Sequence, residues 1–488
     1  MKVSVTLTNE SAWITKASDE AYELLQNEWS YFSPGARFHP AYKLYLRDRD
    51  RASKEGREPL GWDGKIRLFK QGKVPAGLFR ATEDILREKS IEFKLTVDIP
   101  TVLPFLNGVA KSEGQYKFQN ACVKAMMSAL PLGGGIVLCA TGSGKTNMAG
   151  QFFSKLKYTC LFVVDQVDLL YQSQKELAMW MGEDVGVVGD SQYDVKRVTV
   201  ATIQTLYKHV KDKKFMRWFR TVGVVIVDEL HVQMGRTHFN VLDKISPIAR
   251  YGLTATLQLG RKEVRVKAHA FAGPILYRYP IATGQEQGVL TKGSAIQLLF
   301  PADQDTVYAD DYDREVVDNE QKLKMCSRIV RQLLTDKRCV IVLVSRVRHV
   351  KAVHDLFYDI PHGLAYGAIG KIKRRSAILR FEREKTSLII ANKVFEKGVN
   401  IKRVDVIYDL AEMKSKNVVI QKFGRGVRLH KNKKSLLYID SGTLNGRFAK
   451  ASRSRARALK AAGIKVTKVK VIDSGSKAFK TVIAKAKV

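Results

Sequence analysis

Cysteine is scarce in this 488-residue chain, which contains only five. Cys122, Cys139, Cys160, Cys326 and Cys339 are scattered, with no CxxC pair and no pairing with histidine. Such spacing supports neither a zinc site nor a disulfide framework. We therefore expect all five to be small, buried, apolar side chains.

Long hydrophobic runs are also absent. The longest ones, such as VGVVIV before Asp228, have the length of a strand and end in charge. The opening MKVSVTLTNE lacks the apolar core of a signal peptide. These features predict a protein without a membrane partner that works in the cytoplasm, or in the host cell cytoplasm if a phage encodes it.

Acidic residues are in short supply: 48 Asp and Glu stand against 83 Lys and Arg, a net charge of +35. This excess is larger than solubility requires and indicates a polyanionic partner. Nucleic acid is the leading candidate and an anionic membrane surface the second. With 45% hydrophobic residues, the chain is long enough for about three globular domains.

The distribution of apolar runs predicts an α/β fold with four parts. Residues 1–95 mix short alternating segments with turns and are typical of a small α+β N-terminal domain. Residues 96–284 alternate helical stretches with the runs GGGIVLCA, TCLFVVD, VTVAT, VGVVIVD and YGLTAT. Residues 285–445 repeat this rhythm with CVIVLVS, SLIIAN, VDVIYDL and SLLYID. Apolar strands of this kind are typical of parallel sheets covered by helices on both faces, so we expect two such domains in tandem.

The last part, residues 446–488, is a basic C-terminal extension with almost no acids. We predict a helix that begins near Phe448, followed by a β hairpin. Its basic side chains are expected to contact phosphates without regard to sequence, although a merely solubilising tail is the alternative. The candidate nucleic-acid contacts on the helix are Arg453, Arg455 and Arg457.

CATGSGKT, from Cys139 to Thr146, joins an apolar run to a helix-forming stretch. Glycines at that junction direct backbone N–H groups at one point, at the positive end of the helix dipole, and this attracts phosphate. Gly142 and Gly144 allow the close wrap, Lys145 reaches the outer phosphates and Thr146 can ligate Mg²⁺. The pattern G-x-x-x-x-G-K-[ST] is met except that Cys139 replaces the first glycine. An ordinary glycine turn is the alternative.

The segment VVIVDELH places two carboxylates at the end of an apolar strand. Asp228 can hold Mg²⁺ through its water shell, while Glu229 can orient and deprotonate an attacking water. A solvated strand end is the other interpretation.

A third segment, QKFGRGVR, lies in the second α/β region and has Arg425 and Arg428 near one face of a helical turn. Arginines supplied from another domain can stabilise the charge that develops during phosphoryl transfer. A solvated basic face would also explain them.

These three segments, in this order, resemble the DExH branch of the superfamily 2 helicases, and the resemblance extends over roughly residues 115–430. Its further motifs are FQ at Phe118–Gln119, TAT at Thr254–Thr256, VIVLVSRVRHV, and ANKVFEKGVN, which ends at Asn400. The resemblance implies two tandem RecA-like domains that use ATP and Mg²⁺ and convert hydrolysis into domain movement.

The resemblance also implies a role for individual residues. Gln119 would contact adenine, Gln421 would lie near the γ-phosphate, and Arg428 would be the arginine finger with Arg425 as its neighbour. Further nucleotide contacts would come from Thr141, Ser143, His231 and Gly398. Thr202 and Gln204 in VATIQTL would touch the backbone of the tracked strand.

The N-terminal segments YFSPGARFHPAY and GWDGKIRLFKQGKVPAGL are similar to the opening domain of the UvsW-type phage helicases, which remodel branched DNA. Phe38, Trp62, Lys65 and Arg67 interleave aromatic and basic side chains that can stack on bases and pair with phosphates, although core packing would also explain some of the aromatics. The insertion RDRDRASKEGREP between the segments is expected to form an exposed loop.

The sequence thus predicts an ATP-dependent DNA helicase that unwinds or branch-migrates forks, junctions and recombination intermediates. It would bind duplex and single-stranded regions, act as a monomer and have recombination or replication proteins as candidate partners. Three alternatives stay open: an RNA helicase, a translocase on double-stranded DNA that does not separate strands, and a clamp that binds ATP without turnover.

Overall fold

The computed structural model describes residues 3–99, 112–257, 262–302, 312–392, 401–412, 415–472 and 475–486, except the side chains at positions 236 and 371. The chain forms two compact units. The first comprises Met1–Glu113, Lys117–Leu138 and Thr146–Arg278, and the second comprises Gly114–Tyr116, Cys139–Lys145 and Tyr279–Val488. No helix in the described ranges is both long and apolar enough to cross a bilayer. The five cysteines are buried and free, as expected.

The first unit opens with a small α+β module. Its sheet has the order β5-β2-β1-β6, from β1 (Val3–Thr8), β2 (Ser11–Thr15), β5 (Lys73–Pro75) and β6 (Phe93–Asp98). Strands β3 (Ser30–Phe32) and β4 (Lys65–Arg67) form an antiparallel pair, and the helix α2 (Pro40–Glu55) lies between them in the sequence. The helices α1 (Asp19–Glu28) and α3 (Phe79–Glu88) complete the module. Because β6 pairs with β1 in parallel, the module extends past the expected boundary at residue 95 to at least Asp98.

The insertion expected as a loop is mostly helical. Its first nine residues, 47–55, form the C-terminal half of α2, and only the segment from Gly56 onward leaves the helix. Gly56 ends the helix in the left-handed conformation (φ 67°), which glycine adopts without strain. The charges pair along the helix, as in Arg51–Glu55 at 2.7 Å, and this pairing suits a helix surface.

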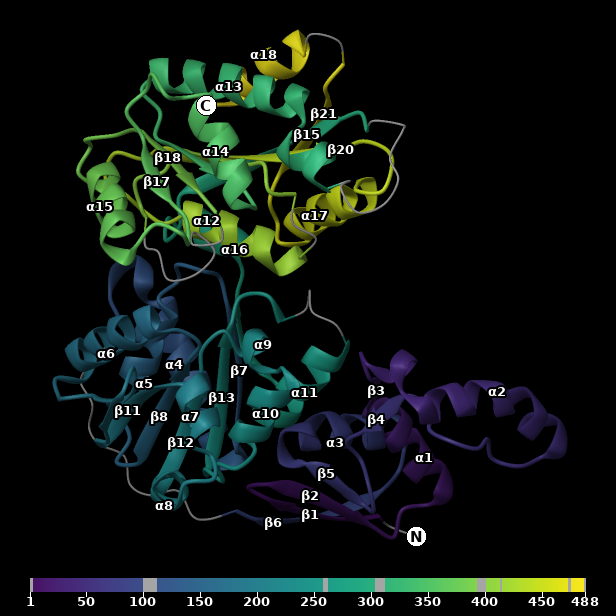
Figure 1. Cartoon of the computed structure of the whole chain (residues 1–488). Helices are drawn as coiled ribbons and strands as arrows, with labels where there is room; N and C mark the ends of the chain where they lie inside the picture. The colour runs from purple at the N-terminus through teal and green to yellow at the C-terminus, as the bar shows by residue number, and fades with distance from the viewer. Residues whose placement is uncertain are drawn as a thin grey trace. The chain divides into compact units, whose positions relative to one another are not determined.

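The rest of the first unit is an eight-stranded sheet in the order β10-β9-β11-β8-β12-β13-β7-β14, with helices on both sides (Figure 1). Its strands are β7 (Gly134–Cys139), β8 (Thr159–Val164), β9 (Gly186–Gly189), β10 (Gln192–Asp194), β11 (Val198–Thr202), β12 (Val222–Val227), β13 (Ala249–Thr254) and β14 (Ile275–Tyr279). Its helices are α4 (Phe118–Ala129), α5 (Lys145–Phe153), α6 (Val167–Met181), α7 (Ile203–Lys208), α8 (Lys213–Thr221), α9 (Leu230–Gln233), α10 (Arg236–Leu242) and α11 (Lys262–Ala272). The five predicted strands are confirmed as β7, β8, β11, β12 and β13.

The second unit contains a seven-stranded sheet in the order β17-β18-β16-β19-β20-β15-β21, and all six pairings between neighbouring strands are parallel. Its strands are β15 (Lys292–Phe300), β16 (Val340–Leu343), β17 (Gly363–Ala365), β18 (Leu388–Ala391), β19 (Val406–Asp409), β20 (Ser435–Thr443) and β21 (Val466–Lys470). Its helices are α12 (Ile281–Glu286), α13 (Glu320–Thr335), α14 (Val347–Asp355), α15 (Lys371–Glu382), α16 (Lys416–Gly426), α17 (Ala449–Ala461) and α18 (Ser476–Ala486). The four predicted strands are present as β16, β18, β19 and β20. The continuous part of the second unit begins at Tyr279, a few residues before the expected boundary at 285.

The basic C-terminal extension is part of this second sheet domain. The predicted helix is present as α17, but the predicted hairpin is wrong, because β21 pairs in parallel with β15 and then leads to α18. Val471, Val482 and Ile483 join the hydrophobic core that β16 and β18 also line. The extension is therefore a structural element of the domain and not a separate tail.

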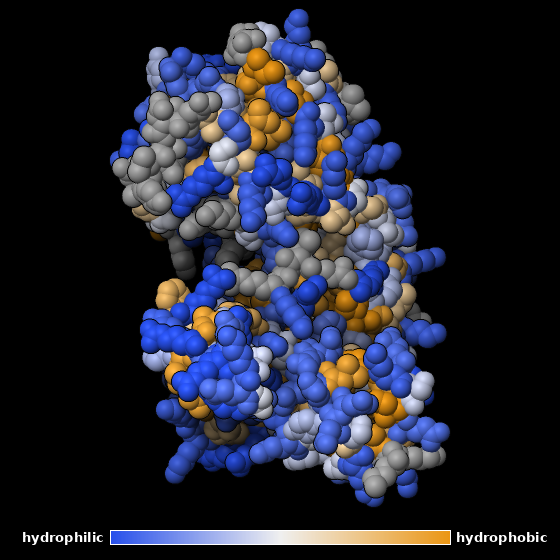
Figure 2. Space-filling model, turned by 90° about the vertical axis from the view of Figure 1, so that its right-hand side faces the viewer, coloured by the Kyte–Doolittle hydropathy of each residue, from blue (hydrophilic) through white to orange (hydrophobic). Residues whose placement is uncertain are grey.

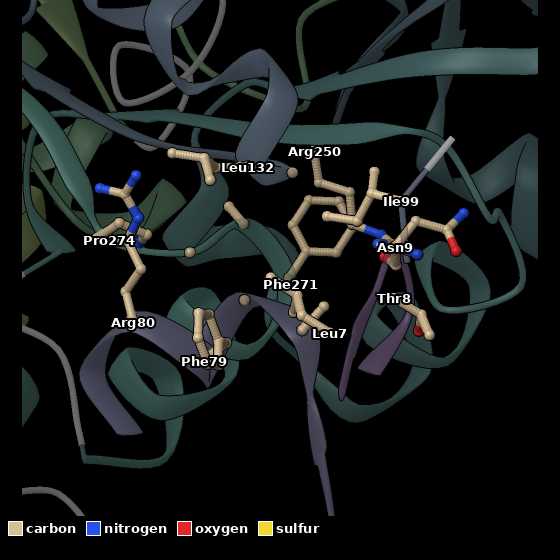
Figure 3. Close-up of a pocket in the computed structure, with 15 residues that line it drawn as sticks. Leu7, Thr8, Asn9, Phe79, Arg80, Ile99, Leu132, Arg250, Phe271 and Pro274 are labelled. Carbon is tan, nitrogen blue, oxygen red and sulfur yellow. Dashed lines mark hydrogen bonds between the residues drawn. The ribbon is translucent and has the colours of Figure 1, made fainter. Parts of the chain in front are cut away.

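The N-terminal module packs on the first sheet domain within the first unit. Gly77 lies so close to α11 that an added Cβ would be 2.3 Å from the carbonyl oxygen of His269. The Arg250 guanidinium, at the start of β13, donates to the carbonyl oxygen of Asn9 at 2.7 Å. Figure 3 shows Phe271 and Arg250 at this seam beside Leu7, and the cavity there has a volume of only about 20 Å³. This part of the seam is thus packed, with room for about one water molecule, whereas a larger cavity of about 380 Å³ lies nearby between Trp13 and Lys73 of the module and Asp243 of the sheet domain.

Candidate nucleotide-binding site

The phosphate loop lies between β7 and α5, as the sequence predicts. Gly142 and Gly144 have φ values of 89° and 82°, a region that side chains with a Cβ rarely adopt. The helix α5 begins at Lys145, so its first N–H groups have no acceptor within the helix and are available to a phosphate. The backbone conformation of the phosphate loop therefore requires glycine at both positions, in agreement with the sequence motif.

Cys139 occupies the last position of β7 and is fully buried. It is not among the residues with positive φ, which explains why this position accepts a residue other than glycine. Its carbonyl oxygen accepts a hydrogen bond from the Nζ of Lys145 at 3.4 Å. This contact holds the Lys145 side chain along the phosphate loop.

The two carboxylates follow β12 directly. The Asp228 N–H donates to the carbonyl oxygen of Val163 at 2.9 Å, so this residue still belongs to the strand ladder. Glu229 then turns into the left-handed region (φ 45°, ψ 50°) and begins α9. This conformation costs a residue with a Cβ about 1 kcal/mol or more, and such strain concentrates at functional sites. The backbone thus separates the directions of two neighbouring carboxylates.

His231 connects this segment to the TAT segment. Its Nδ1 lies 2.8 Å from the Thr254 hydroxyl and 3.5 Å from a Glu229 carboxylate oxygen. The same hydroxyl accepts a hydrogen bond from the N–H of Thr256 at 3.3 Å. Because β13 lies between β12 and β7 in the sheet, these groups share the edge at which the phosphate loop begins. A change at Glu229 can therefore reach the TAT segment through one side chain.

Gln119 lies on α4 and is 1% exposed. Its Oε1 accepts hydrogen bonds from the Ser112 hydroxyl and from the Gln151 amide, the latter at 3.3 Å. The structure thus places this glutamine in a buried network that includes α5, and its contact with adenine stays a prediction.

The two candidate contacts to a nucleic-acid strand differ. Gln204 is exposed at the start of α7, and its amide donates to the carbonyl oxygen of Asp165 at 2.9 Å. Thr202 is 3% exposed and its hydroxyl is hydrogen-bonded to that of Thr205 at 2.9 Å. Only Gln204 offers a side chain at the surface, whereas Thr202 has only its backbone to offer.

In the second unit, α16 carries Gln421 and Arg425, and Arg428 follows the end of the helix at Gly426. The N–H of Arg428 lies 3.5 Å from the carbonyl oxygen of Arg425, so the helical turn extends past the helix end. Both arginine side chains are half-buried. The predicted helical turn is therefore present, with Arg425 in the last turn of α16 and Arg428 just after it.

The helix α16 is held by a buried ion pair that the sequence did not reveal. Lys422, next to Gln421, lies 2.8 Å from Asp409 at the end of β19, and both side chains are almost fully buried. The Tyr438 hydroxyl donates to the same carboxylate. Burial raises the pKa of Asp409, but the facing ammonium and these hydrogen bonds outweigh it and the pKa is lowered. The sequence signal for this ion pair was Lys422 itself, which directly follows Gln421. Its partner Asp409 lies 13 residues earlier in the sequence.

The turn that bears Arg428 is fixed at its backbone as well. Its carbonyl oxygen accepts hydrogen bonds from the Thr291 hydroxyl at 3.3 Å and from the Lys433 ammonium at 3.2 Å. Burial lowers the pKa of Lys433 to about 8. These contacts fix the backbone from which the Arg428 side chain extends.

The candidate DNA contacts in the extension separate into two classes. Arg453 and Arg457 are exposed on α17, but Arg455 is 1% exposed and its Nε donates to Asp440 at 2.8 Å. The prediction that Arg455 contacts nucleic acid is therefore wrong, because this guanidinium is a core group. Asp440, its partner, comes from β20 in the same sheet.

Among the N-terminal candidates, Phe38 is 83% exposed, Lys65 is exposed and Trp62 is half-buried. Arg67 forms an ion pair with Asp63 at 2.5 Å, which takes up part of its charge. Gly398 and the ANKVFEKGVN segment from Lys393 onward lie outside the described residues.

The residues of the first sheet fit a nucleotide with a divalent cation. Among the described residues, no group of three or more His, Cys, Asp or Glu side chains could hold a metal alone. Mg²⁺ at a nucleotide takes one or two protein oxygens and the phosphates, so this donor set is sufficient. Thr146 and Asp228 are the oxygens available for it at this edge of the sheet.

Comparison with known proteins gives two family matches. Residues 115–259 match the family described as type III restriction enzyme, res subunit, and residues 321–430 match the helicase conserved C-terminal domain. The two matches contain the phosphate loop, the DELH segment and QKFGRGVR.

Two curated relatives cover most of the chain. A DNA 3'-5' translocase, XPB2, from Sulfurisphaera tokodaii is 22% identical over 81% of this chain and 95% of its own length. The ATP-dependent DNA helicase uvsW from Enterobacteria phage T4 is 25% identical over 85% of each chain. A solved structure, the ATP-dependent type ISP restriction-modification enzyme LlaBIII bound to DNA, shares the fold with a TM-score of 0.55 and 12% identity, over 83% of this chain and 36% of its own. With the motifs located on the edges of two parallel sheets, the chain belongs to the superfamily 2 helicases, resembles UvsW among them, and is an ATP-dependent helicase.

Proposed function

We propose that this helicase acts on DNA and remodels branched substrates, namely forks, junctions and recombination intermediates. The observation that carries the motor part is the link from Glu229 through His231 to Thr254 at the sheet edge beside the phosphate loop. It joins the candidate catalytic carboxylate to the segment that is expected to pass hydrolysis on to movement. The net charge of +35 supports a nucleic-acid track, and the names of both relatives support DNA.

Bound ATP with Mg²⁺ would supply the phosphoryl group whose transfer to water releases the free energy. Lys145 binds the outer phosphates, and Thr146 and Asp228 hold the cation. Glu229, which lies in the left-handed region directly after the strand, takes the proton from the attacking water. Arg428, with Arg425 beside it, stabilises the charge that develops on the departing phosphate, and Gln421 lies near it.

The DNA contacts of the proposal are the exposed side chains found on two parts of the chain. Phe38 and Lys65 stand on the N-terminal module, and Arg453 and Arg457 stand on α17. None of these side chains has the arrangement needed to read base edges, so binding depends on DNA structure and not on sequence. We further propose that the protein acts as a monomer in the cytoplasm.

An ATPase assay on matched RNA, linear DNA and forked or four-way DNA tests this proposal. Branched DNA should stimulate hydrolysis more than linear duplex, and RNA should stimulate it least. Equal stimulation by linear and branched DNA would contradict the remodelling role, and stronger stimulation by RNA would favour an RNA helicase.

Two substitutions test the chemistry. Glu229→Gln should reduce DNA-stimulated hydrolysis by about 100-fold or more, the usual contribution of a general base, and Lys145→Ala should abolish it through loss of the phosphate contact, while DNA binding is largely retained in both. Glu286→Gln, at an exposed carboxylate of α12, is the matched control and should leave hydrolysis unchanged. Turnover that persists in either of the first two variants would remove that residue from the mechanism.

A further inference from the structure

One aromatic side chain stands out on the surface of the N-terminal module. Phe38 is 83% exposed at the end of a short 3-10 turn, Ala36–Phe38, whose first residue is fully buried. The turn therefore fixes the backbone while the ring projects into solvent. Removal of a phenyl ring from water is favourable, so a ring that is exposed in this way is suited to contact with a flat apolar partner.

We propose that Phe38 is the strand-separating wedge of this helicase, which stacks on the last base pair of the duplex where the strands part. This inference rests on the proposed action on branched DNA and adds to it the element that converts translocation into unwinding. The occupant of the surface is a nucleobase pair at the branch point. A phenyl ring has no hydrogen-bonding group, so it stacks on any base without reading sequence.

A wedge must resist force, and the base of Phe38 is rigid. His39 begins α2 by accepting a hydrogen bond from the N–H of Ala41 at its Nδ1, at 3.2 Å. The same imidazole packs edge-on against Trp62 with ring centroids 5.3 Å apart. Trp62 is itself fixed, because its Nε1 donates to the carbonyl oxygen of Lys65 at 2.7 Å. The residue after the wedge is thus held from both sides.

A second aromatic cluster supports the other flank of the turn. Phe32 lies edge-on to Tyr42 at 5.3 Å, and Tyr42 stacks on Tyr45 at 6.3 Å. Gly64 lies against these rings so closely that an added Cβ would be 2.6 Å from the Phe32 ring, and its φ is 78°. Because Gly64 has no side chain, the loop of the GWDG segment packs closely on these rings, and this close packing makes the support of Phe38 more rigid.

The charge around the ring complements a DNA phosphate backbone. Arg37, Lys43, Arg47 and Lys65 are exposed on the turn, α2 and β4. Among the neighbouring arginines, Arg57 is already paired with Asp48 at 2.6 Å. Figure 2 shows a face of the molecule on which hydrophilic side chains surround small hydrophobic patches. An apolar ring in basic surroundings fits a base pair and its phosphates better than it fits a neutral protein surface.

The module is also attached firmly to the motor domain that it would serve. Gly77 lies directly against the backbone of α11, and Arg250 donates a hydrogen bond to the carbonyl oxygen of Asn9. Ala270 of α11 belongs to the same hydrophobic cluster as Val5 and Leu78 of the module. Force on the ring therefore passes into the first sheet domain through packed contacts and not through a linker.

The test compares strand separation with hydrolysis in Phe38→Ala. Unwinding of a fork with a fluorescent strand should fall roughly 5- to 150-fold, the factor that loss of one base–aromatic stack carries, and this loss should exceed any loss of the ATPase activity measured at saturating single-stranded DNA. Phe38→Trp should restore unwinding. The matched control is Tyr358→Ala, which removes an aromatic ring that is 81% exposed in the second unit and should change neither quantity.

The outcomes separate the wedge from the proposed function. Unwinding by Phe38→Ala at the rate of the unaltered chain overturns the wedge and leaves the DNA helicase intact. An equal loss of unwinding and hydrolysis also overturns it, because Phe38 would then act in general DNA binding. Loss that appears only when another protein is added would assign the ring to a protein partner and reject the wedge. If the unaltered chain shows no DNA-stimulated hydrolysis, the proposed function itself fails.

Discussion

Arg455 provides a direct test of the role assigned to the C-terminal extension. Its guanidinium is fully buried, with Nε 2.8 Å from Asp440 and Nη2 2.9 Å from the carbonyl oxygen of Ser441. Gln297 donates to the other oxygen of Asp440 at 2.7 Å. Arg455→Ala would leave this carboxylate buried without its cation, which costs about 3–5 kcal/mol of the free energy of unfolding. For a domain of this size, the melting temperature should fall by roughly 6–20 °C.

The same helix supplies the controls. Arg453 and Arg457 are exposed on α17, so Arg453→Ala and Arg457→Ala should change the free energy of unfolding by no more than about 0.5 kcal/mol. DNA binding should show the reverse order. Each exposed arginine that touches a phosphate should reduce the slope of log affinity against log salt by about one, while Arg455→Ala leaves the slope unchanged.

The deficit of Arg455→Ala should also depend on pH. Burial already raises the pKa of Asp440 to about 6 in the intact chain, and loss of the facing guanidinium raises it further. A carboxyl whose pKa is raised on folding contributes stability at low pH and loses it as the pH rises. Thermal unfolding followed at several pH values should thus show a smaller deficit in acid. A melting temperature for Arg455→Ala equal to those of the controls at neutral pH would refute the reasoning.

Further changes probe other buried groups of the second unit. Burial lowers the pKa of His349 from 6.5 to about 4. The neutral imidazole therefore contributes about 3 kcal/mol to the free energy of unfolding, which is fully present above pH 6.5 and is lost as the pH falls through 4. Urea unfolding of His349→Asn should lack this share of the acid sensitivity. Lys422→Met should cost about 3–5 kcal/mol, and the double change with Asp409→Leu should recover much of it in the same assay. Truncation after Gly446 removes β21 and two packed helices, so it should give an unfolded second domain by circular dichroism and not merely weaker salt dependence. A soluble, cooperatively folded truncation product would contradict the placement of the extension in the sheet.

The central strands of both sheets could be predicted because each is a short run of Val, Ile and Leu buried on both faces. Three of the strands that were missed have weaker patterns: β17 is only GLA, β10 is QYD, and β21 alternates with lysine. Such strands lie at or near the sheet edges, where one side lacks a neighbour and polar residues are tolerated. Their positions depend on the rest of the sheet and not on their own composition.

The positions of the motif residues could be predicted, but their local geometry could not. The left-handed conformation of Glu229 is one that no residue type specifies. The contact between His231 and Thr254 joins residues that are 23 positions apart in the sequence. The error at Arg455 has a similar cause. A basic run is usually solvated, and the carboxylate that buries this arginine comes from β20, 15 residues earlier.

The buried charges of the second unit include two pairs that influence each other electrostatically: Lys422 of α16 with Asp409, to which Tyr438 also donates, and Arg455 with Asp440. A buried ion pair adds little stability over apolar side chains of the same volume, because desolvation offsets the attraction. Its directional bonds nevertheless allow only one register between a helix and a strand. Ridges of apolar side chains on α16 would permit small shifts, and a shift of one ångström at an arginine finger is enough to slow phosphoryl transfer. The pair of Lys422 with Asp409 therefore matters more for where Arg425 and Arg428 stand than for whether the domain folds, so the double apolar variant should regain stability without regaining hydrolysis.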